Sequence, residues 1–133
     1  MATIDITPPV GYRMSGYFRE RLCTGTDNPL QAKALVMQQG STQTAWIFCD
    51  LIGLNADISQ AARQQITRAT GIPVNNILIT ATHSHTGPLY YGALRDHFHT
   101  QAVARHGEDP LEKVDYPAQL IARIVQVAQQ AQQ

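Results

Sequence analysis

The stretch ILITATHSHTGP, residues 77–88, is an apolar run that ends abruptly at two histidines spaced one residue apart. Its first five residues have the composition of a buried strand, and Gly87 and Pro88 predict a turn directly after the histidines. On an extended strand residues i and i+2 share a face, whereas on a helix they point about 200° apart. We therefore predict that His83 and His85 lie together at the end of a strand.

The residues before this run predict that the strand belongs to a βαβ unit. AWIFCD, residues 45–50, is almost wholly apolar toward its end, as in a strand covered on both faces. From Asp57, a reasonable N-cap, to about Thr70, apolar side chains recur at three- and four-residue steps, and Gly71 and Pro73 then end the helix. The apolar positions of this helix are Ile58, Ala61, Ala62, Ile66 and Ala69. Strand, helix and strand in this order predict two parallel strands joined by a right-handed crossover.

The other periodic segments add strands and a second helix. Residues 2–7 alternate as in a short strand, and residues 30–40 and 42–50 flank Gly40 and Ser41 as in a hairpin. From about residue 116 to 130 one helical face carries Leu120, Ile121, Ile124, Val125 and Ala128. We therefore predict one α/β domain over residues 1–133, with a mixed sheet that contains the right-handed βαβ unit and helices packed on that sheet. Ligands bind at the carboxyl ends of parallel strands in such folds.

Two segments show no clear period. Residues 10–29 are rich in glycine and aromatic residues, which predicts an irregular loop. Residues 87–113 form a long polar segment, and a structureless loop of that length is usually functional or disordered. The histidines of the second segment are further candidate metal ligands or simply solvated side chains: His97, His99 and His106. The arginines of the first segment are candidates to orient a substrate oxyanion or carboxylate, although solvent exposure is the more common state for any one of them: Arg13, Arg19 and Arg21.

Composition narrows the classes of partner. Charged residues make up 15% of the 133 residues and the formal net charge is zero, so no basic face predicts binding to nucleic acid or to an anionic membrane. A small molecule or another protein is the expected partner. The two cysteines, Cys23 and Cys49, form no CxxC pair and are expected to be buried, reduced thiols. No apolar stretch approaches the roughly 20 residues of a membrane helix. The opening MATIDITPPVG lacks a basic start and an apolar core, so we expect no signal peptide and, by default, a cytoplasmic location.

The histidine pair has the chemistry of a metal site. Neutral imidazole is a common zinc ligand, and catalytic zinc usually has three protein ligands and one open position. Two histidines alone are equally compatible with a hydrogen-bonded turn that holds no metal. The hydroxyls that alternate with them favour a polar pocket, because buried hydroxyls need partners. These hydroxyls belong to Thr82, Ser84 and Thr86.

Asp50 is a second candidate, because it ends the first strand of the same βαβ unit and should lie at the same edge of the sheet. A carboxylate there can orient a ligand histidine through its second ring nitrogen, bind metal directly or act on a proton. It can equally cap the following turn. The geometry alone leaves these roles open.

Four stretches of the chain resemble the N-terminal part of the neutral (alkaline, non-lysosomal) ceramidase family. They are IDITPPVGYRMSGY (4–17), GTDNPLQAKALVM (25–37), WIFCDLIGL (46–54) and NNILITATHSHTGP (75–88). The last is the most specific, because that family carries a strand followed by Thr-His-Thr-His-Ser-Gly-Pro. The resemblance implies a zinc ion that activates water to attack the amide of an N-acyl sphingoid lipid. It further implies that His83 is a zinc ligand and that His85 contacts the water or the substrate.

The sequence also departs from that family. Its members supply further zinc ligands, another His, a Glu and a Tyr, from later in a much longer chain, and Gly25-Thr26-Asp27 stands where they tend to read Gly-Ile-His. We therefore expect the N-terminal portion of a larger ceramidase-like catalytic domain, and members of the family are often secreted. The alternatives are a short homologue that completes its site by other means, a degenerate homologue that binds without catalysis, or a homo-oligomer whose neighbouring subunit supplies ligands.

Overall fold

The computed structural model describes residues 1–133 and contains a four-stranded mixed sheet with two helices packed on one face. The strands are β1 (Ala2–Asp5), β2 (Gln31–Gln39), β3 (Thr42–Cys49) and β4 (Ile77–Ala81). The helices are α1 (Ala56–Thr70), α2 (Ala93–His106) and α3 (Tyr116–Gln132), with a short 3₁₀ turn, η1, at Val74–Asn76. The strand order is β1-β2-β3-β4, antiparallel except for the parallel pair β3 and β4. The predicted α/β fold is thus confirmed.

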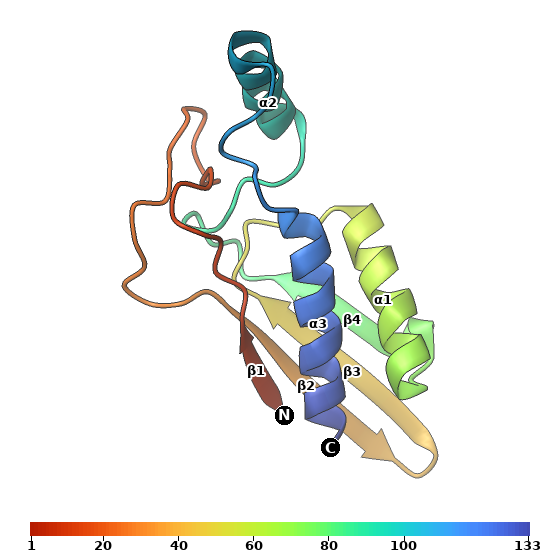
Figure 1. The fold of residues 1–133 in the computed structure, drawn as a ribbon. Coiled ribbons are helices and arrows are strands. Elements are labelled where there is room, and N and C mark those ends of the chain that lie inside the picture. Colours follow the sequence, from red (N-terminus) through yellow and green to blue (C-terminus); the bar gives the residue numbers. More distant parts are fainter.

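The βαβ unit consists of β3, α1 and β4. Cys49 pairs with Ala81 at the carboxyl ends of the two parallel strands, so the residues that follow both strands emerge at one edge of the sheet. α1 crosses one face of the sheet between them, in the right-handed sense that this connection nearly always takes (Figure 1). The helix ends at Gly71, as predicted, with φ of 77° and its amide bonded to the Thr67 carbonyl. The predicted N-cap is wrong: Asn55 holds that position, and Asp57 lies in the first turn, where its charge suits the helix dipole.

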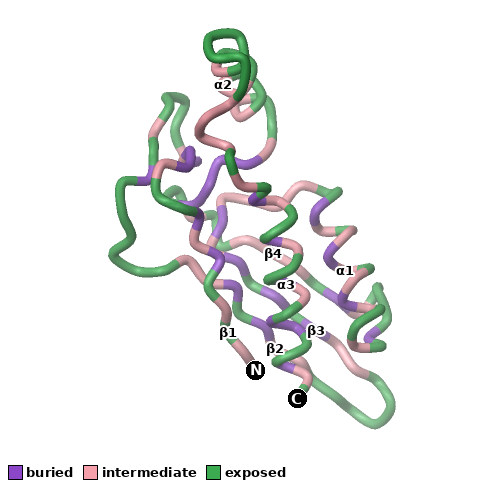
Figure 2. The backbone as a smooth tube through the Cα atoms, viewed as in Figure 1, coloured by how far each residue is buried: buried purple, intermediate pink, exposed green.

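The hydrophobic core lies between the sheet and the two helices α1 and α3. Ile47 and Cys49 face this layer from β3, and Ile66 and Ile124 face it from α1 and α3, all fully buried. Each buried Ile or Leu side chain stabilises the fold by about 1.5–3 kcal/mol. Figure 2 shows the buried residues gathered along the sheet beneath the two helices. The helical stripes read from the sequence are the ones that pack here, except that Ala69 is exposed.

The other face of the sheet has no covering layer. Trp46, Phe48 and Leu78 point to that face and are 40%, 39% and 48% exposed. The expectation that this stretch of β3 is covered on both faces is therefore wrong. Both helices pack on the same side, so the strand alternates between buried and exposed residues although its composition is apolar throughout.

Residues 87–113 do not form a structureless loop, because α2 occupies half of them. This helix has 14 residues, no buried residue, and a glycine with positive φ at each end, Gly92 (87°) and Gly107 (80°). It projects beyond the carboxyl ends of the strands (Figure 1). A polar helix without an apolar stripe gives no hydrophobic periodicity, which is why the sequence pattern missed it.

The C-terminal helix α3 is capped by Asp115, whose carboxylate accepts a hydrogen bond from the Ala118 backbone amide at 3.0 Å. It extends to Gln132, two residues beyond the predicted end, and Leu120 and Ile124 are buried as predicted. The two termini lie close together (Figure 1), with the Met1 amino group 3.5 Å from the Ala131 carbonyl oxygen. None of the helices combines the length and apolar character needed to span a lipid bilayer.

Candidate functional site

Asp50 and Thr82 meet where the two parallel strands end. The Thr82 hydroxyl donates to Asp50 Oδ1 at 3.2 Å, and the backbone amide of Gln31 donates to Asp50 Oδ2 at 3.1 Å. The carboxylate therefore ties together residues from the ends of three strands. The prediction that Asp50 and the histidine motif share one edge of the sheet is confirmed. The carboxylate forms no hydrogen bond to a histidine, so the predicted ways in which it would act on the site stay predictions.

His83 has the only positive φ of any non-glycine residue, 65°. A left-handed conformation at a residue of this kind costs on the order of 1–3 kcal/mol and is typically retained at functional sites. Its ring nitrogen Nδ1 lies 2.8 Å from the Ile52 carbonyl oxygen. Because a carbonyl only accepts hydrogen bonds, Nδ1 carries the proton of the neutral ring and Nε2 then keeps its lone pair. His83 thus presents one unprotonated nitrogen, the atom that a metal ion would bind.

The two histidines of the motif lie beside each other, as predicted. The ring centroids of His83 and His85 are 5.1 Å apart and the rings meet at 71°. The predicted reason is wrong, however, because β4 ends at Ala81 and the kink at His83 interrupts the extended backbone. The rings approach across that kink and the turn after it. Both side chains are exposed.

All three hydroxyls of the motif have partners within the protein. Thr82 bonds to Asp50, and the Ser84 and Thr86 hydroxyl oxygens lie 2.9 Å apart. The backbone also continues to pair beyond the strand, since the Ser84 amide donates to the Leu51 carbonyl at 3.0 Å. The motif is therefore a defined turn and not a flexible loop end.

An N-terminal segment, residues 13–17, docks on this turn. The Ser15 amide and hydroxyl both donate to the Gly87 carbonyl, at 2.9 and 3.0 Å. Gly16 has φ of +100°, and a Cβ there would lie 2.6 Å from the Cβ of His85. Only glycine fits this contact. Sequence reasoning placed these residues in an irregular loop, and the glycine among aromatic residues was the only local signal of the contact.

A cavity of about 510 Å³ opens beside the two histidines. Its apolar wall includes Tyr17, Leu89, Tyr91 and Leu94, and no carboxylate or thiol lines it. The Tyr90 hydroxyl, at the same cavity, donates to the Gly53 carbonyl at 2.7 Å, and burial raises the pKa of Tyr90, so this hydroxyl stays neutral. The cavity is therefore apolar with imidazole nitrogens at its side.

A second polar cluster lies apart from the motif. Ligand atoms of His99, Asp109 and Glu112 lie within 4.8 Å of one another, beside a separate cavity of about 570 Å³. Arg13 Nη1 donates to Asp109 Oδ2 at 2.6 Å, and Arg95 pairs with Glu112. These guanidinium groups occupy the carboxylate oxygens that a cation would need, so the cluster is an ion-pair network.

The burial of this network corrects one expectation. Arg13 is 1% exposed, not a solvated loop charge, while Arg19 is exposed and unpaired. Burial alone would raise the pKa of Asp109, but the hydrogen bonds from Arg13, from the Leu111 amide and from His99 together lower it below its ordinary value. The network joins residue 13 to residue 109, and this pairing had no signal in the local sequence.

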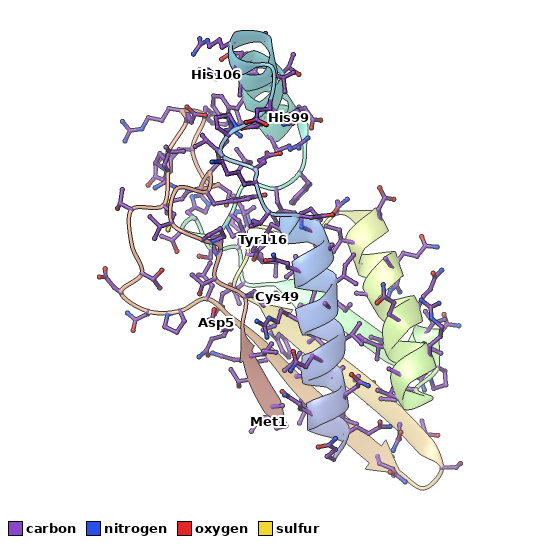
Figure 3. The ribbon with its side chains drawn as sticks, in the orientation of Figure 1. Met1, Asp5, Cys49, His99, His106 and Tyr116 are labelled. Carbon is purple, nitrogen blue, oxygen red and sulfur yellow. The ribbon has the colours of Figure 1, made fainter.

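The loop histidines lie on α2 and not beside the motif. Figure 3 shows His99 and His106 on this helix, away from the sheet. His97 is exposed and lies 3.1 Å from the Gln101 amide nitrogen, and His106 is exposed without a partner. His99 belongs to the ion-pair network. None of the three lines the cavity of His83 and His85.

Both cysteines are free and buried, as predicted. Burial, with a smaller contribution from the charge of Asp50, raises the pKa of Cys49 to about 12. The thiol is therefore protonated at neutral pH and does not act as a nucleophile.

The fold and the motif together define an α/β protein with a histidine pair at the edge of the sheet where its two parallel strands end. No known family profile matches the chain, and no curated protein matches it in sequence. Among solved structures it is similar to the neutral ceramidase from Pseudomonas aeruginosa, with a TM-score of 0.74 and 18% sequence identity. The match covers 98% of this chain and 20% of the ceramidase chain, so this chain spans about a fifth of that protein's length. At this identity the likeness establishes a shared fold.

Proposed function

We propose that this chain contributes the His83 and His85 part of the active site of a zinc-dependent hydrolase. The bond cleaved is the amide of an N-acyl lipid, such as an N-acyl sphingoid. The observation that carries the proposal is the free Nε2 of His83, fixed by the Nδ1 contact to Ile52 in a strained backbone, beside an apolar cavity. The fold shared with a neutral ceramidase supports the same assignment.

The donor set fits zinc in kind but not in number. His83 offers one imidazole nitrogen and His85 lies close enough to be a second donor or a neighbour. Catalytic zinc uses three protein ligands, and the cavity offers no carboxylate or thiol. We therefore propose that these residues are the N-terminal portion of a larger catalytic domain that supplies the other ligands. When bound, zinc supplies Lewis-acid activation of water and of the amide carbonyl.

The chain's own residues have separate tasks in this proposal. His83 would hold the metal through Nε2, and His85, which is exposed beside it, would contact the substrate or move a proton at its ring nitrogen. Asp50 accepts the Thr82 hydroxyl at the start of the motif and lies outside the cavity lining, so its proposed task is to act on the site through this contact. The apolar wall of Tyr17, Leu89, Tyr91 and Leu94 suits an acyl chain, because burying its methylenes there contributes about 0.8 kcal/mol each.

The test is hydrolysis of a panel of N-acyl amides by the full product of the gene, with and without added zinc. We expect turnover that requires zinc, that is lost in His83→Ala and that is unchanged in His106→Ala, the exposed histidine on α2. Equal loss in both variants, or full activity in His83→Ala, would refute the assignment of His83.

A second candidate function is a non-catalytic binding module that keeps a relic of the histidine pair. The absence of any carboxylate or thiol from the cavity lining favours it. In the same assay this module would bind N-acyl amides without turnover, with or without zinc. A homo-oligomer completed by a neighbouring subunit is a third arrangement, and it requires the mass in solution to rise when zinc is added.

A further inference from the structure

One arginine outside the histidine motif contacts the motif directly. Arg21 Nη2 donates to the Ser15 carbonyl at 2.6 Å and to the His85 carbonyl at 2.7 Å. Its guanidinium carbon also lies 4.2 Å from the centroid of the Tyr17 ring. A single side chain thus joins the docked N-terminal segment to the turn that carries His85.

The carbonyls of Ser15 and His85 have Arg21 as their hydrogen-bond donor and no other. No backbone amide donates to the carbonyl of Ser15 or of His85. Arg21 forms no ion pair, whereas Arg13 and Arg95 are paired with carboxylates. The planar guanidinium can donate hydrogen bonds in its plane while stacking on an aromatic ring, and an ammonium group cannot reproduce this geometry.

We propose that Arg21 is a positioning residue that sets the orientation of His85. It holds the His85 backbone against Gly16, where the two segments of the chain touch without room for a Cβ. It also holds the Tyr17 ring edge-on to the His85 imidazole, with centroids 6.1 Å apart at 83°. The assignment rests on the proposed function in one respect, because it explains how His85 is presented to the substrate.

His83 provides an internal reference for this role. Its orientation depends on the Nδ1 contact to Ile52, which Arg21 does not touch. Loss of Arg21 should therefore disturb His85 and Tyr17 while it leaves His83 in place. A residue that merely stabilised the fold would affect both histidines alike.

The test is NMR of the 133-residue chain as Arg21→Met, Arg21→Lys and the control Arg19→Met, which removes an exposed and unpaired arginine from the same loop. We expect Arg21→Met to lose the nuclear Overhauser effect between the Tyr17 and His85 rings and to broaden the His85 ring signals. His83 should keep its Nδ1 hydrogen bond to Ile52 and its single tautomer, while its shifts follow the neighbouring His85 ring, 5.1 Å away. Arg21→Lys should keep part of the effect, and Arg19→Met all of it.

Two results would overturn the proposal: an unchanged Tyr17–His85 effect in Arg21→Met, or loss of the His83 Nδ1 bond to Ile52 together with the change at His85. If Arg21→Met does not fold, Arg21→Lys decides, since a weaker Tyr17–His85 effect with the His83 bond to Ile52 kept supports the role and an unchanged spectrum refutes it. These measurements need neither zinc nor substrate, so a failure of the Arg21 proposal can be distinguished from a failure of the hydrolase proposal. In the hydrolysis assay of the full gene product, kcat should fall about tenfold or more in Arg21→Met with little change in KM. Arg21→Lys should recover part of the lost kcat.

Discussion

The Nδ1 atom of His83 donates to the carbonyl oxygen of Ile52 at 2.8 Å, and this bond determines which nitrogen of the motif is free. We predict that His83 exists as a single tautomer, protonated at Nδ1, whenever its ring is neutral. Long-range ¹H–¹⁵N spectra of the imidazoles measure this directly. His106, exposed and without a partner, is the matched control and should show a mixture of tautomers. A mixture at His83 as well would mean that the Ile52 bond does not orient the ring.

Gly16 permits the close approach of two chain segments at His85. In Gly16→Ala the new Cβ would meet the His85 Cβ at 2.6 Å, in a backbone with φ of +100°. Gly11→Ala is the control, because φ there is +88° but nothing lies within 4 Å. We expect urea unfolding to show a loss of about 1–2 kcal/mol for Gly11→Ala from backbone strain. Gly16→Ala should lose about 1–3 kcal/mol more from overpacking, and equal losses would contradict the packed contact.

The buried pair of Arg13 and Asp109 anchors the segment around α2. Both side chains are 2% exposed, so Asp109→Asn leaves a buried guanidinium with poorer compensation. Breaking such a pair typically costs about 3–5 kcal/mol, and we expect about 2–3 kcal/mol because Glu20 and Glu112 remain near Arg13. Asp96→Asn, at a carboxylate that is 66% exposed, should change the free energy of unfolding by less than about 0.5 kcal/mol. Urea denaturation compares the two variants, and equal losses would contradict the role of the pair.

The Asp109 carboxylate makes the stability of the fold depend on pH in the acid range. The pKa of Asp109 is lower in the folded protein than its ordinary value of 3.8, so the unfolded chain takes up a proton first. The stabilisation is complete above the ordinary value and is lost as the pH falls through the lower, folded pKa. The Tm of the parent protein should therefore fall more steeply below pH 4 than the Tm of Asp109→Asn. Parallel pH profiles would show that Asp109 is not the responsible group.

The two faces of β3 should respond differently to truncation. Ile47 is fully buried beneath the helices, whereas its neighbour Phe48 is 39% exposed on the open face. We expect Ile47→Ala to cost about 2–5 kcal/mol and Phe48→Ala to cost much less, although it removes more atoms. Chemical denaturation of both variants makes the comparison. A larger loss for Phe48→Ala would mean that the open face is covered in solution.

The sequence predicted the parts of the fold that depend on periodicity and chain direction. The change from alternating to helical spacing between Cys49 and Ile77 predicted the βαβ unit, and parallel strands then bring Asp50 and the histidines to one edge. The open face was not predictable, because an apolar residue such as Trp46 looks the same in a covered or an exposed strand. The side on which a helix packs is decided by tertiary structure.

The sequence offered the candidate site residues but not their geometry. His83 and His85 were recognised from their spacing, yet the left-handed backbone that brings them together is set by contacts to Ile52 and Leu51. The role of Arg21 depends on a bond to a residue 64 positions away. Such long-range contacts to backbone carbonyls leave no pattern in the sequence, because any residue supplies the carbonyl.

Zinc titration followed by NMR tests the central claim most directly. The account predicts that zinc shifts the His83 Nε2 signal first and the His85 signals with it, that the chain alone holds the metal weakly, and that His83→Ala abolishes these shifts. His99, whose partners are guanidinium groups and carboxylates, should not respond at the same zinc concentration. Stoichiometric zinc that resists a chelator, or a response at His99 without one at His83, would contradict the account.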